Sequence, residues 1–366
     1  MLKSLHLQNL TVFPDAEFLF GKNLNVILGE NGSGKSHVLK AAYCAIAVSA
    51  QGRKDGSSDP PTKGFLATAL ATKLSRVFMP DALGRLASRR QGRATCHCSY
   101  SFAPESLNLG FSFSTASTKE VVVDKLPTSW APMRPVFLPT RELLTISPGF
   151  VSLYETTYLP FEETWRDTCL LLGAPLARGP RLAAIKQLLQ PLEQAMGGKV
   201  ELDKAGRFYL NVASGSMEMH LVAEGLRKLA TLARLIATGS LLGKGYLFWD
   251  EPESNLNPRI IKTVAKTILQ LAKSGIQVFI ATHSLFLMRE LHILQQQRFQ
   301  ELDTRCFGLH LTGDGTVSVK QGKTMDAVGS IAALDEDLEQ ADRYIDTEMG
   351  LPLTADGSEP ENPSED

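Results

Sequence analysis

The most chemically informative residues form a glycine-rich loop near the N-terminus. Residues 29–36 read GENGSGKS, which matches the pattern G-x-x-x-x-G-K-[ST] in full. Its glycines let backbone N–H groups point at phosphate oxygens. We expect the Lys35 ammonium to lie on the β- and γ-phosphates of a nucleotide, and the Ser36 hydroxyl to bind Mg²⁺. The candidate nucleotide-binding residues of this segment are Gly29, Glu30, Asn31, Gly32, Ser33, Gly34, Lys35, Ser36 and His37.

Two adjacent carboxylates supply a second part of this chemistry. Asp250 and Glu251 follow the apolar run 246–249, which is typical of a buried parallel strand. A carboxylate at the C-terminal end of a central strand sits beside the phosphate loop, so we expect Asp250 to hold Mg²⁺, directly or through water. Glu251 is expected to orient and polarise the attacking water. The alternative, a strand end with two solvated acids, is less favoured because the phosphate loop upstream is complete.

A histidine stands at the end of a third apolar run. His283 follows residues 276–281 and comes one strand–helix crossover after Glu251. A single histidine is more often a structural residue, but this position favours a hydrogen bond to the γ-phosphate or to the attacking water. The predicted catalytic residues are therefore Lys35, Glu251 and His283.

These segments, in this order, resemble the motifs of ABC-type ATPases. GENGSGKS is similar to the Walker A motif, LFWDEPESNLNP to the Walker B motif with its D-loop, and IATHS to the switch-histidine segment. The chain most resembles the SMC/RecF/OLD-like branch, whose members are named AAA ATP-binding proteins and occur in bacterial genome-maintenance and anti-phage systems. The resemblance covers residues 1–47 and 215–320 well and the middle of the chain poorly.

The resemblance implies a signature loop that a partner subunit presents to ATP. Its best match is Ala223, Glu224 and Gly225, at the start of a helix predicted to run to about residue 238. Ala223 stands where serine is common, and an ordinary helix N-terminus is the alternative. No clear Q-loop glutamine is present. Arg141 and Glu142 lie where the two lobes should join, and either is a candidate for coupling them.

The resemblance also implies the fold class. It is an α/β fold of the P-loop NTPase, ABC-ATPase type, with a mixed central sheet flanked by helices, an antiparallel β part and a helical lobe insertion. The expected division is residues 1–148 for the N-terminal half of the ATPase lobe, 149–198 for the helical insertion, 199–325 for the C-terminal half, and 326–366 for a terminal helix and a disordered acidic tail.

Local patterns predict the individual elements. Two strands should precede the phosphate loop, and no segment sustains the heptads of long coiled-coil arms. The expected helices are 37–50, 65–78, 81–90, 150–158, 161–172, 180–196, 259–273 and 284–296. The expected strands outside the central motifs are 93–102, 107–114 and 120–123, with hairpins at 200–212 and 306–320.

Composition limits the classes of partner. The chain has 366 residues and a net charge of −1, which gives no overall basic signal for nucleic acid or membrane. No apolar stretch reaches about 18 residues and the N-terminus does not resemble a signal peptide, so we expect a cytoplasmic protein without a membrane partner. The Cys96-His97-Cys98 cluster is better explained by strand residues in a reducing compartment than by zinc. A basic run at Arg85, Arg89, Arg90 and Arg93 indicates either a solvated helix face, which we favour, or contact with nucleic-acid phosphates.

The expected function is ATP binding and hydrolysis with Mg²⁺, in a homodimer or higher oligomer that sandwiches ATP. Three roles compete: a regulator or sensor in a bacterial anti-phage defence system acting with a separately encoded effector, a RecF-like repair ATPase that binds DNA, and a nucleotide-gated scaffold without turnover. A transporter subunit is a weaker fourth. No nuclease is expected in this chain, because residues 335–337 lie on a predicted helix rather than at a strand end.

Overall fold

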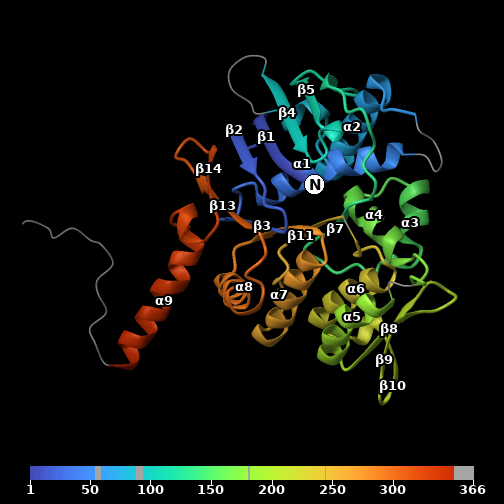
Figure 1. Cartoon of the computed structure of the whole chain (residues 1–366), viewed down its shortest axis with the longest axis vertical. Helices are drawn as coiled ribbons and strands as arrows, with labels where there is room; N and C mark the ends of the chain where they lie inside the picture. Colours follow the sequence, from blue (N-terminus) through green and yellow to red (C-terminus); the bar gives the residue numbers. More distant parts are fainter. Residues whose placement is uncertain (54–58, 88–93, 180–181, 244, 350–366) are drawn as a thin grey trace, which may run out of the picture.

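A six-stranded sheet forms the centre of the molecule (Figure 1). The computed structural model describes residues 1–53, 59–87, 94–179, 182–243 and 245–349. All neighbouring strands of this sheet are parallel except the edge pair β13 and β14, which is antiparallel. The strand order is β14 (Val317–Gly322), β13 (Thr304–Leu311), β3 (Leu24–Gly29), β12 (Gln277–Thr282), β11 (Tyr246–Asp250) and β7 (Val136–Leu138).

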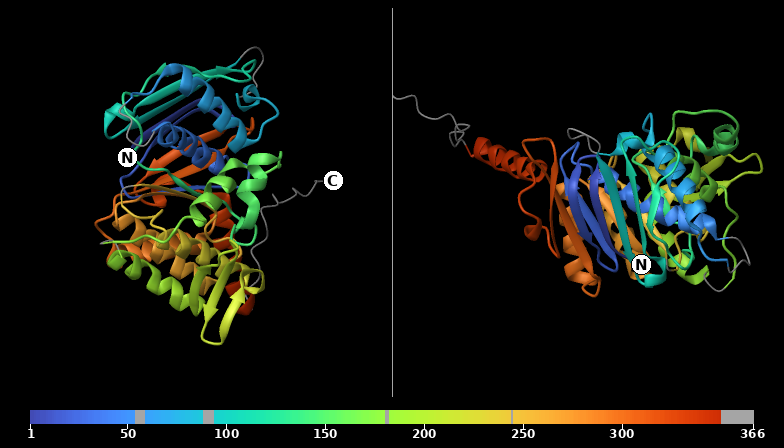
Figure 2. Two further views of the ribbon diagram at one scale, coloured as in Figure 1. Left: turned by 90° about the vertical axis from the view of Figure 1, so that its right-hand side faces the viewer. Right: turned by 90° about the horizontal axis from the view of Figure 1, so that it is seen from above.

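A second sheet of five antiparallel strands lies over one face of the first, with helix α1 (Lys35–Gly52) between them (Figure 2). Tyr100 of this sheet donates a hydrogen bond to the Ala41 carbonyl of α1 (3.1 Å), which ties the two layers together. Helix α2 (Lys63–Phe78) packs beside α1. The strand order is β2 (Phe13–Leu19), β1 (Leu2–Leu10), β4 (Thr95–Phe102), β5 (Leu109–Ser114) and β6 (Val122–Lys125).

The other face of the central sheet is covered by helices (Figure 1). A small sheet of three antiparallel strands extends from this helical layer, and α9 projects from the opposite side of the molecule (Figure 2). The helices are α3 (Ser147–Thr156), α4 (Glu163–Leu172), α5 (Leu182–Met196), α6 (Glu224–Ala237), α7 (Pro258–Lys273), α8 (Leu285–Arg298) and α9 (Ala332–Glu348). The strands of this small sheet are β8 (Gly198–Leu202), β9 (Phe208–Val212) and β10 (Gly215–Glu218).

The central strands are buried on both faces, which explains their nearly continuous apolar sequences. Successive side chains alternate between two cores. Val278 and Ile280 of β12 pack among the helices α6, α7 and α8, whereas Phe279 faces α1 and the antiparallel sheet. The sheet is therefore held from both sides, and its carboxyl edge is a rigid support for the loops that follow.

Most predicted elements are present with small shifts of their ends. Three strands rather than two precede the phosphate loop, since residues 13–19 fold back on β1, and β10 was not predicted.

The helix predicted over residues 81–90 is wrong for the part that the structure describes, residues 81–87. Only a 3₁₀ turn, η1 (Leu83–Leu86), forms there. There Gly84 N donates to the Ser117 carbonyl and the Leu86 carbonyl accepts from Thr11 N, so part of the backbone bonds to the turns after β5 and β1 instead of continuing a helix. Arg85 is exposed, and the rest of the basic run lies outside the described residues.

All five cysteines are free and buried. Cys96 and Cys98 point from β4 into the core with their sulfurs 3.8 Å apart, while His97 is on the exposed face. Burial raises the pKa of the Cys306 thiol to about 11 and that of Cys169 to about 12. Within the described residues, no helix is both long enough and apolar enough to cross a membrane.

A buried group of charges joins helix α4 to helices α1 and α2. Lys73 of α2 lies 3.1 Å from Glu163 and 2.6 Å from Asp167, and the Tyr43 hydroxyl of α1 also donates to Asp167 (2.6 Å). Burial alone would raise the pKa of Asp167, but Lys73, Tyr43 and Arg166 together hold it below its usual value. The charges therefore fix the helical layer to the layer that carries the phosphate loop.

Lys73→Ala should lower the free energy of unfolding by about 3 kcal/mol at pH 8, because it leaves two carboxylates buried without their cation. Denaturant unfolding measures this. In the variant Tyr43 and Arg166 still act on Asp167, but the contribution of Lys73 is lost, so the folded-state pKa of Asp167 lies above its wild-type value. The loss of stability should then shrink as the pH falls toward that pKa. Lys63→Ala, an exposed position on the same helix, is the control. Equal effects of the two substitutions would contradict the role of the ion group.

Candidate functional site

Three neighbouring parallel strands bring the phosphate loop, the acidic pair and His283 to one edge of the central sheet. β12 lies between β3 and β11, with Thr282 paired to Leu28 and Ala281 paired to Asp250. The phosphate loop follows β3, the acidic pair ends β11, and His283 follows β12. Residues almost 250 positions apart in sequence thus meet because their strands share a direction and a register.

The phosphate loop turns sharply between β3 and α1. Gly34 has a φ of +86°, and a side chain there would come within 2.7 Å of Val12 and 2.8 Å of Phe13. Lys35 is buried and donates to the carbonyls of Gly29 (2.8 Å) and Glu30 (2.9 Å). Burial lowers the Lys35 pKa, and the nearby carboxylates oppose this change. The loop therefore holds a positive charge close to its own backbone, where a phosphate would sit.

His37 is the first residue after Ser36 on α1 and faces the β1–β2 turn. Its Nδ1 lies 2.9 Å from the Thr11 hydroxyl, and its ring packs 5.5 Å from that of Phe78. Burial, helped by Lys40, lowers the His37 pKa to about 4. His37 is therefore neutral near neutral pH.

Asp250 and Ser36 have the chemistry of a magnesium site. Asp250 is buried, and its Oδ1 has no hydrogen-bond partner within the described part of the chain. Burial raises the Asp250 pKa, while the Ser36 hydroxyl beside it lowers it. A buried carboxylate oxygen without a partner, next to a hydroxyl, fits a small hard cation that prefers oxygen ligands. These two residues thus suit the Mg²⁺ of a bound nucleotide.

Glu251 and His283 lie close together above this edge. The Glu251 carboxylate is 3.4 Å from His283 Nδ1, and both side chains remain partly open to solvent. Glu251 has a φ of +47°, which is uncommon for a residue with a side chain. Its backbone N–H is held by the Ala281 carbonyl at 2.9 Å. A hydrogen bond to the neighbouring strand thus holds the backbone in this uncommon conformation.

A further carboxylate, which is not among the predicted site residues, fixes the segment around His283. Thr282 Oγ1 donates to Glu253 (2.6 Å) and accepts from Ser284 N (3.0 Å). Glu253 is buried, and burial raises its pKa. The bonds hold the residues on both sides of His283. The sequence signal was a third acid, two residues after the pair.

The signature candidates and the D-loop pack against each other, in the helical half of the molecule (Figure 1). Ala223 caps α6, Asn255 donates to Glu224 (2.9 Å), and a side chain at Gly225 would come within 3.2 Å of the Asn255 carbonyl. Lys228, also on α6, is bonded to Ser254. These residues border an open hollow of about 620 Å³.

Glu142, rather than Arg141, makes the contact at the predicted lobe junction. Its carboxylate lies 2.9 Å from Arg227 Nε on α6 and accepts a hydrogen bond from the Thr145 hydroxyl (2.7 Å). Arg141 is exposed. The segment after β7 is therefore joined to the helix that carries the signature candidates.

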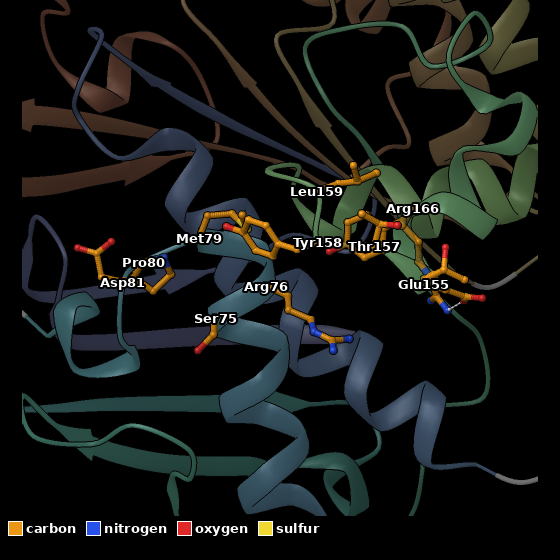
Figure 3. A pocket seen from close by; sticks show the side chains of 12 residues that line it. Ser75, Arg76, Met79, Pro80, Asp81, Glu155, Thr157, Tyr158, Leu159 and Arg166 are labelled. Carbon is orange, nitrogen blue, oxygen red and sulfur yellow. Dashed lines mark hydrogen bonds and ion pairs between the residues drawn. The ribbon is translucent and has the colours of Figure 1, made fainter.

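The molecule has another, larger hollow of about 680 Å³ (Figure 3). It lies between the end of α2 and the segment that joins α3 to α4. Met79, Tyr158 and Leu159 line its centre, and Arg76 and Arg166 lie along its border. None of the predicted site residues lines it.

Two family models match parts of the chain. The model described as "AAA domain, putative AbiEii toxin, Type IV TA system" matches residues 174–289, and one described as "AAA domain" matches residues 4–73. A curated relative, the structural maintenance of chromosomes protein 6 of Takifugu rubripes, is 40% identical over 67 residues. That match covers 18% of this chain and only 6% of the relative.

Solved SMC heads share the fold. An Smc head bound to the C-terminal winged-helix domain of ScpA gives a TM-score of 0.54 at 13% identity, covering 89% of this chain and 98% of that one. A Pyrococcus furiosus Smc head with an extended coiled coil, bound to the C-terminal domain of ScpA, gives 0.50 at 10% identity, covering 94% and 99%. The predicted fold, an α/β P-loop ATPase with a mixed sheet flanked by helices, is confirmed.

Lys35→Ala should weaken ATP binding by about 10- to 100-fold, because it removes a charged donor from the phosphates. Titration of a fluorescent ATP analogue measures the affinity. Lys22→Ala, an exposed lysine just before β3, should leave it unchanged. Unchanged affinity in Lys35→Ala would show that this loop does not hold the phosphates.

Proposed function

We propose that this chain, which belongs to the SMC/RecF-like ABC-type ATPases, binds ATP and hydrolyses it to ADP and phosphate at a site completed by a second copy. The observation that carries the proposal is the meeting of Lys35, Asp250 and Glu251 at one sheet edge, with His283 3.4 Å from Glu251. A phosphate loop, an acid without a partner and an acid next to histidine together form the groups that nucleotide hydrolysis requires.

Each group has a distinct task in this reaction. The water oxygen attacks the γ-phosphorus, Glu251 accepts the water proton, and the bond from the γ-phosphorus to the β–γ bridging oxygen breaks, so that ADP leaves. Lys35 binds the β- and γ-phosphates, and His283 donates to the γ-phosphate or orients the water. Mg²⁺, held by Ser36 and Asp250, would neutralise charge on the same phosphates.

The second copy is needed because one subunit leaves the γ-phosphate side of its nucleotide open. The hollow bordered by Ala223, Glu224 and Gly225 belongs to the helical half of the molecule and is open to solvent. The N-terminus of α6 is a natural partner for an anionic phosphate. We therefore place this hollow against the ATP of the other subunit, in a head-to-tail dimer with two composite sites.

The biological role that we propose is that of a cytoplasmic regulator or sensor in a bacterial anti-phage defence system, acting with a separately encoded effector. Two features support this role. The description of one matched family model names a putative toxin of a type IV TA system, and the similar Smc heads were solved in complex with a separate protein, ScpA. The net charge of −1 argues against DNA as the main partner.

Glu251→Gln should reduce ATP turnover by about 100-fold or more, since it removes the base but keeps the shape of the side chain. ATP should still bind, so the variant should accumulate as a dimer. Phosphate release and light scattering, each with and without ATP, measure the two effects. Glu218→Gln, on the exposed strand β10, is the control. Normal hydrolysis in Glu251→Gln would exclude its role as base.

Duplex DNA in the same assay separates the biological roles. Turnover that DNA leaves unchanged agrees with a regulator of a protein effector. Strong stimulation by DNA that weakens as salt is raised would favour the repair ATPase instead. ATP-dependent dimerisation without turnover in the wild type would point to a nucleotide-gated scaffold.

Thr282→Val should lower the turnover rate by about tenfold or more with little change in ATP affinity, because the hydroxyl positions the segment of His283 without touching the nucleotide. A comparison of kcat with the ATP dissociation constant tests this. Thr312→Val, an exposed threonine beyond the end of β13, is the control. An affinity that falls as much as the rate would contradict a purely positioning role.

A further inference from the structure

Helix α9 projects from the body with almost all of its described side chains exposed (Figure 2). Leu338, Ile345 and Met349 follow one another along one face of the helix, and all three are exposed. An apolar stripe on a solvated helix is typical of a surface that packs against something else. No element of the described chain covers it.

Acidic residues flank this apolar stripe. Glu339, Asp342 and Asp346 are three and four positions apart, so they line the side next to it. None of the three makes an ion pair with a described residue. The one cation of the helix, Arg343, is bound to Glu336 (3.0 Å) on another side. The exposed face of α9 therefore carries an acidic stripe without counter-charges.

A groove on the helical layer has the complementary character. It has a volume of about 370 Å³ and runs along α7, between α5 and α8. Its apolar lining includes Pro191, Ala195 and Leu294. A docked helix could bury an apolar stripe against these side chains.

The charges of this groove are mainly positive. Arg259, Lys262 and Lys266 line it from one face of α7, and none of them has an ion-pair partner in the described ranges. Glu290 is the carboxylate among its lining residues. The groove thus has three unpaired cations against one acid.

The spacing of the two stripes agrees. Arg259, Lys262 and Lys266 are separated by three and four positions, as are Glu339, Asp342 and Asp346. An α-helix rises 1.5 Å per residue, so both stripes place their charges about 4.5 and 6 Å apart along the axis. Two helices that lie side by side and run in the same direction could therefore pair all three charges in order, while the apolar stripe of α9 faces the apolar part of the groove.

We propose that α9 of one copy docks into the α5–α7–α8 groove of a second copy, through an apolar contact with paired charges beside it. The helix and the groove are different surfaces of the chain. If two copies each dock their helix into the other's groove, the assembly closes as a dimer; if each copy docks into the next one, it grows into a ring or a filament. This contact uses neither the phosphate loop nor the hollow at α6. It therefore does not depend on the proposed ATPase function and would form without nucleotide.

A charge-swap experiment on the full chain tests the proposal. The groove variant is Lys262→Glu with Lys266→Glu, and the helix variant is Asp342→Lys with Asp346→Lys, the two acids that lie opposite those lysines. Sedimentation and light scattering follow the mass of the nucleotide-free protein over a wide concentration range. Each variant should self-associate about tenfold more weakly than wild type, because two attractive pairs become repulsive. The combined variant should regain the wild-type mass, because its pairs are attractive again.

Lys199→Glu with Lys204→Glu, at exposed positions on and beside the strand β8, makes the same change in net charge as the groove variant and should have no effect. High salt should weaken the wild-type association. A wild type that stays monomeric at every concentration would overturn the proposal, as would a combined variant that associates no better than either parent. If the protein is a monomer and the charge swaps change its free energy of unfolding, then α9 docks into the groove of its own chain. That result would also overturn the proposal. ATP turnover should be normal in all variants with dilute protein, so a failure here is distinct from a failure of the ATPase assignment.

Discussion

The parallel pairing of β3, β12 and β11 is the constraint on which the rest of the structure depends. These strands are apolar on both faces, so they are stable only between two layers, one made of α1 with the antiparallel sheet and the other of helices. Because the pairing fixes direction and register, the loops after the three strands must open at the same edge. A slip of one residue in β12 would exchange its two faces and turn Thr282 away from Glu253. The polar contacts of the site thus depend on a strand register that apolar packing determines.

The sequence was most informative where local chemistry and strand patterns agree. The phosphate loop, the acidic pair at the end of β11 and the histidine after β12 could be located because each follows a short apolar run. Patterns failed where the backbone bonds to a distant segment. Residues 83–86 contain good helix formers, yet hydrogen bonds from Thr11 and to Ser117 decide their conformation. Glu253 was missed for a related reason, since its burial depends on a threonine hydroxyl 29 residues later.

Two groups of ion pairs hold the helical layer in place, and neither could be predicted from local sequence patterns. Lys73, Glu163 and Asp167 come from helices about 90 residues apart and meet in a nearly dry interface. Glu142 and Arg227 meet between the segment after β7 and the signature helix. Such pairs add little net stability compared with apolar packing, but an incorrect alignment would leave buried charges unpaired. Their effect is mainly on the relative orientation of the two layers, which determines where the hollow at α6 faces.

The burial of every cysteine has a practical consequence for optical experiments. A maleimide dye reacts with an accessible thiolate, and the native thiols are enclosed in the core, with burial raising the pKa of Cys44, Cys169 and Cys306. A single new cysteine on an exposed surface would therefore be the preferred attachment point, without removal of the native ones. Pairs of dyes placed in this way on the hairpin β9–β10 and on α9 would report distances between subunits by energy transfer, and so show how copies are arranged.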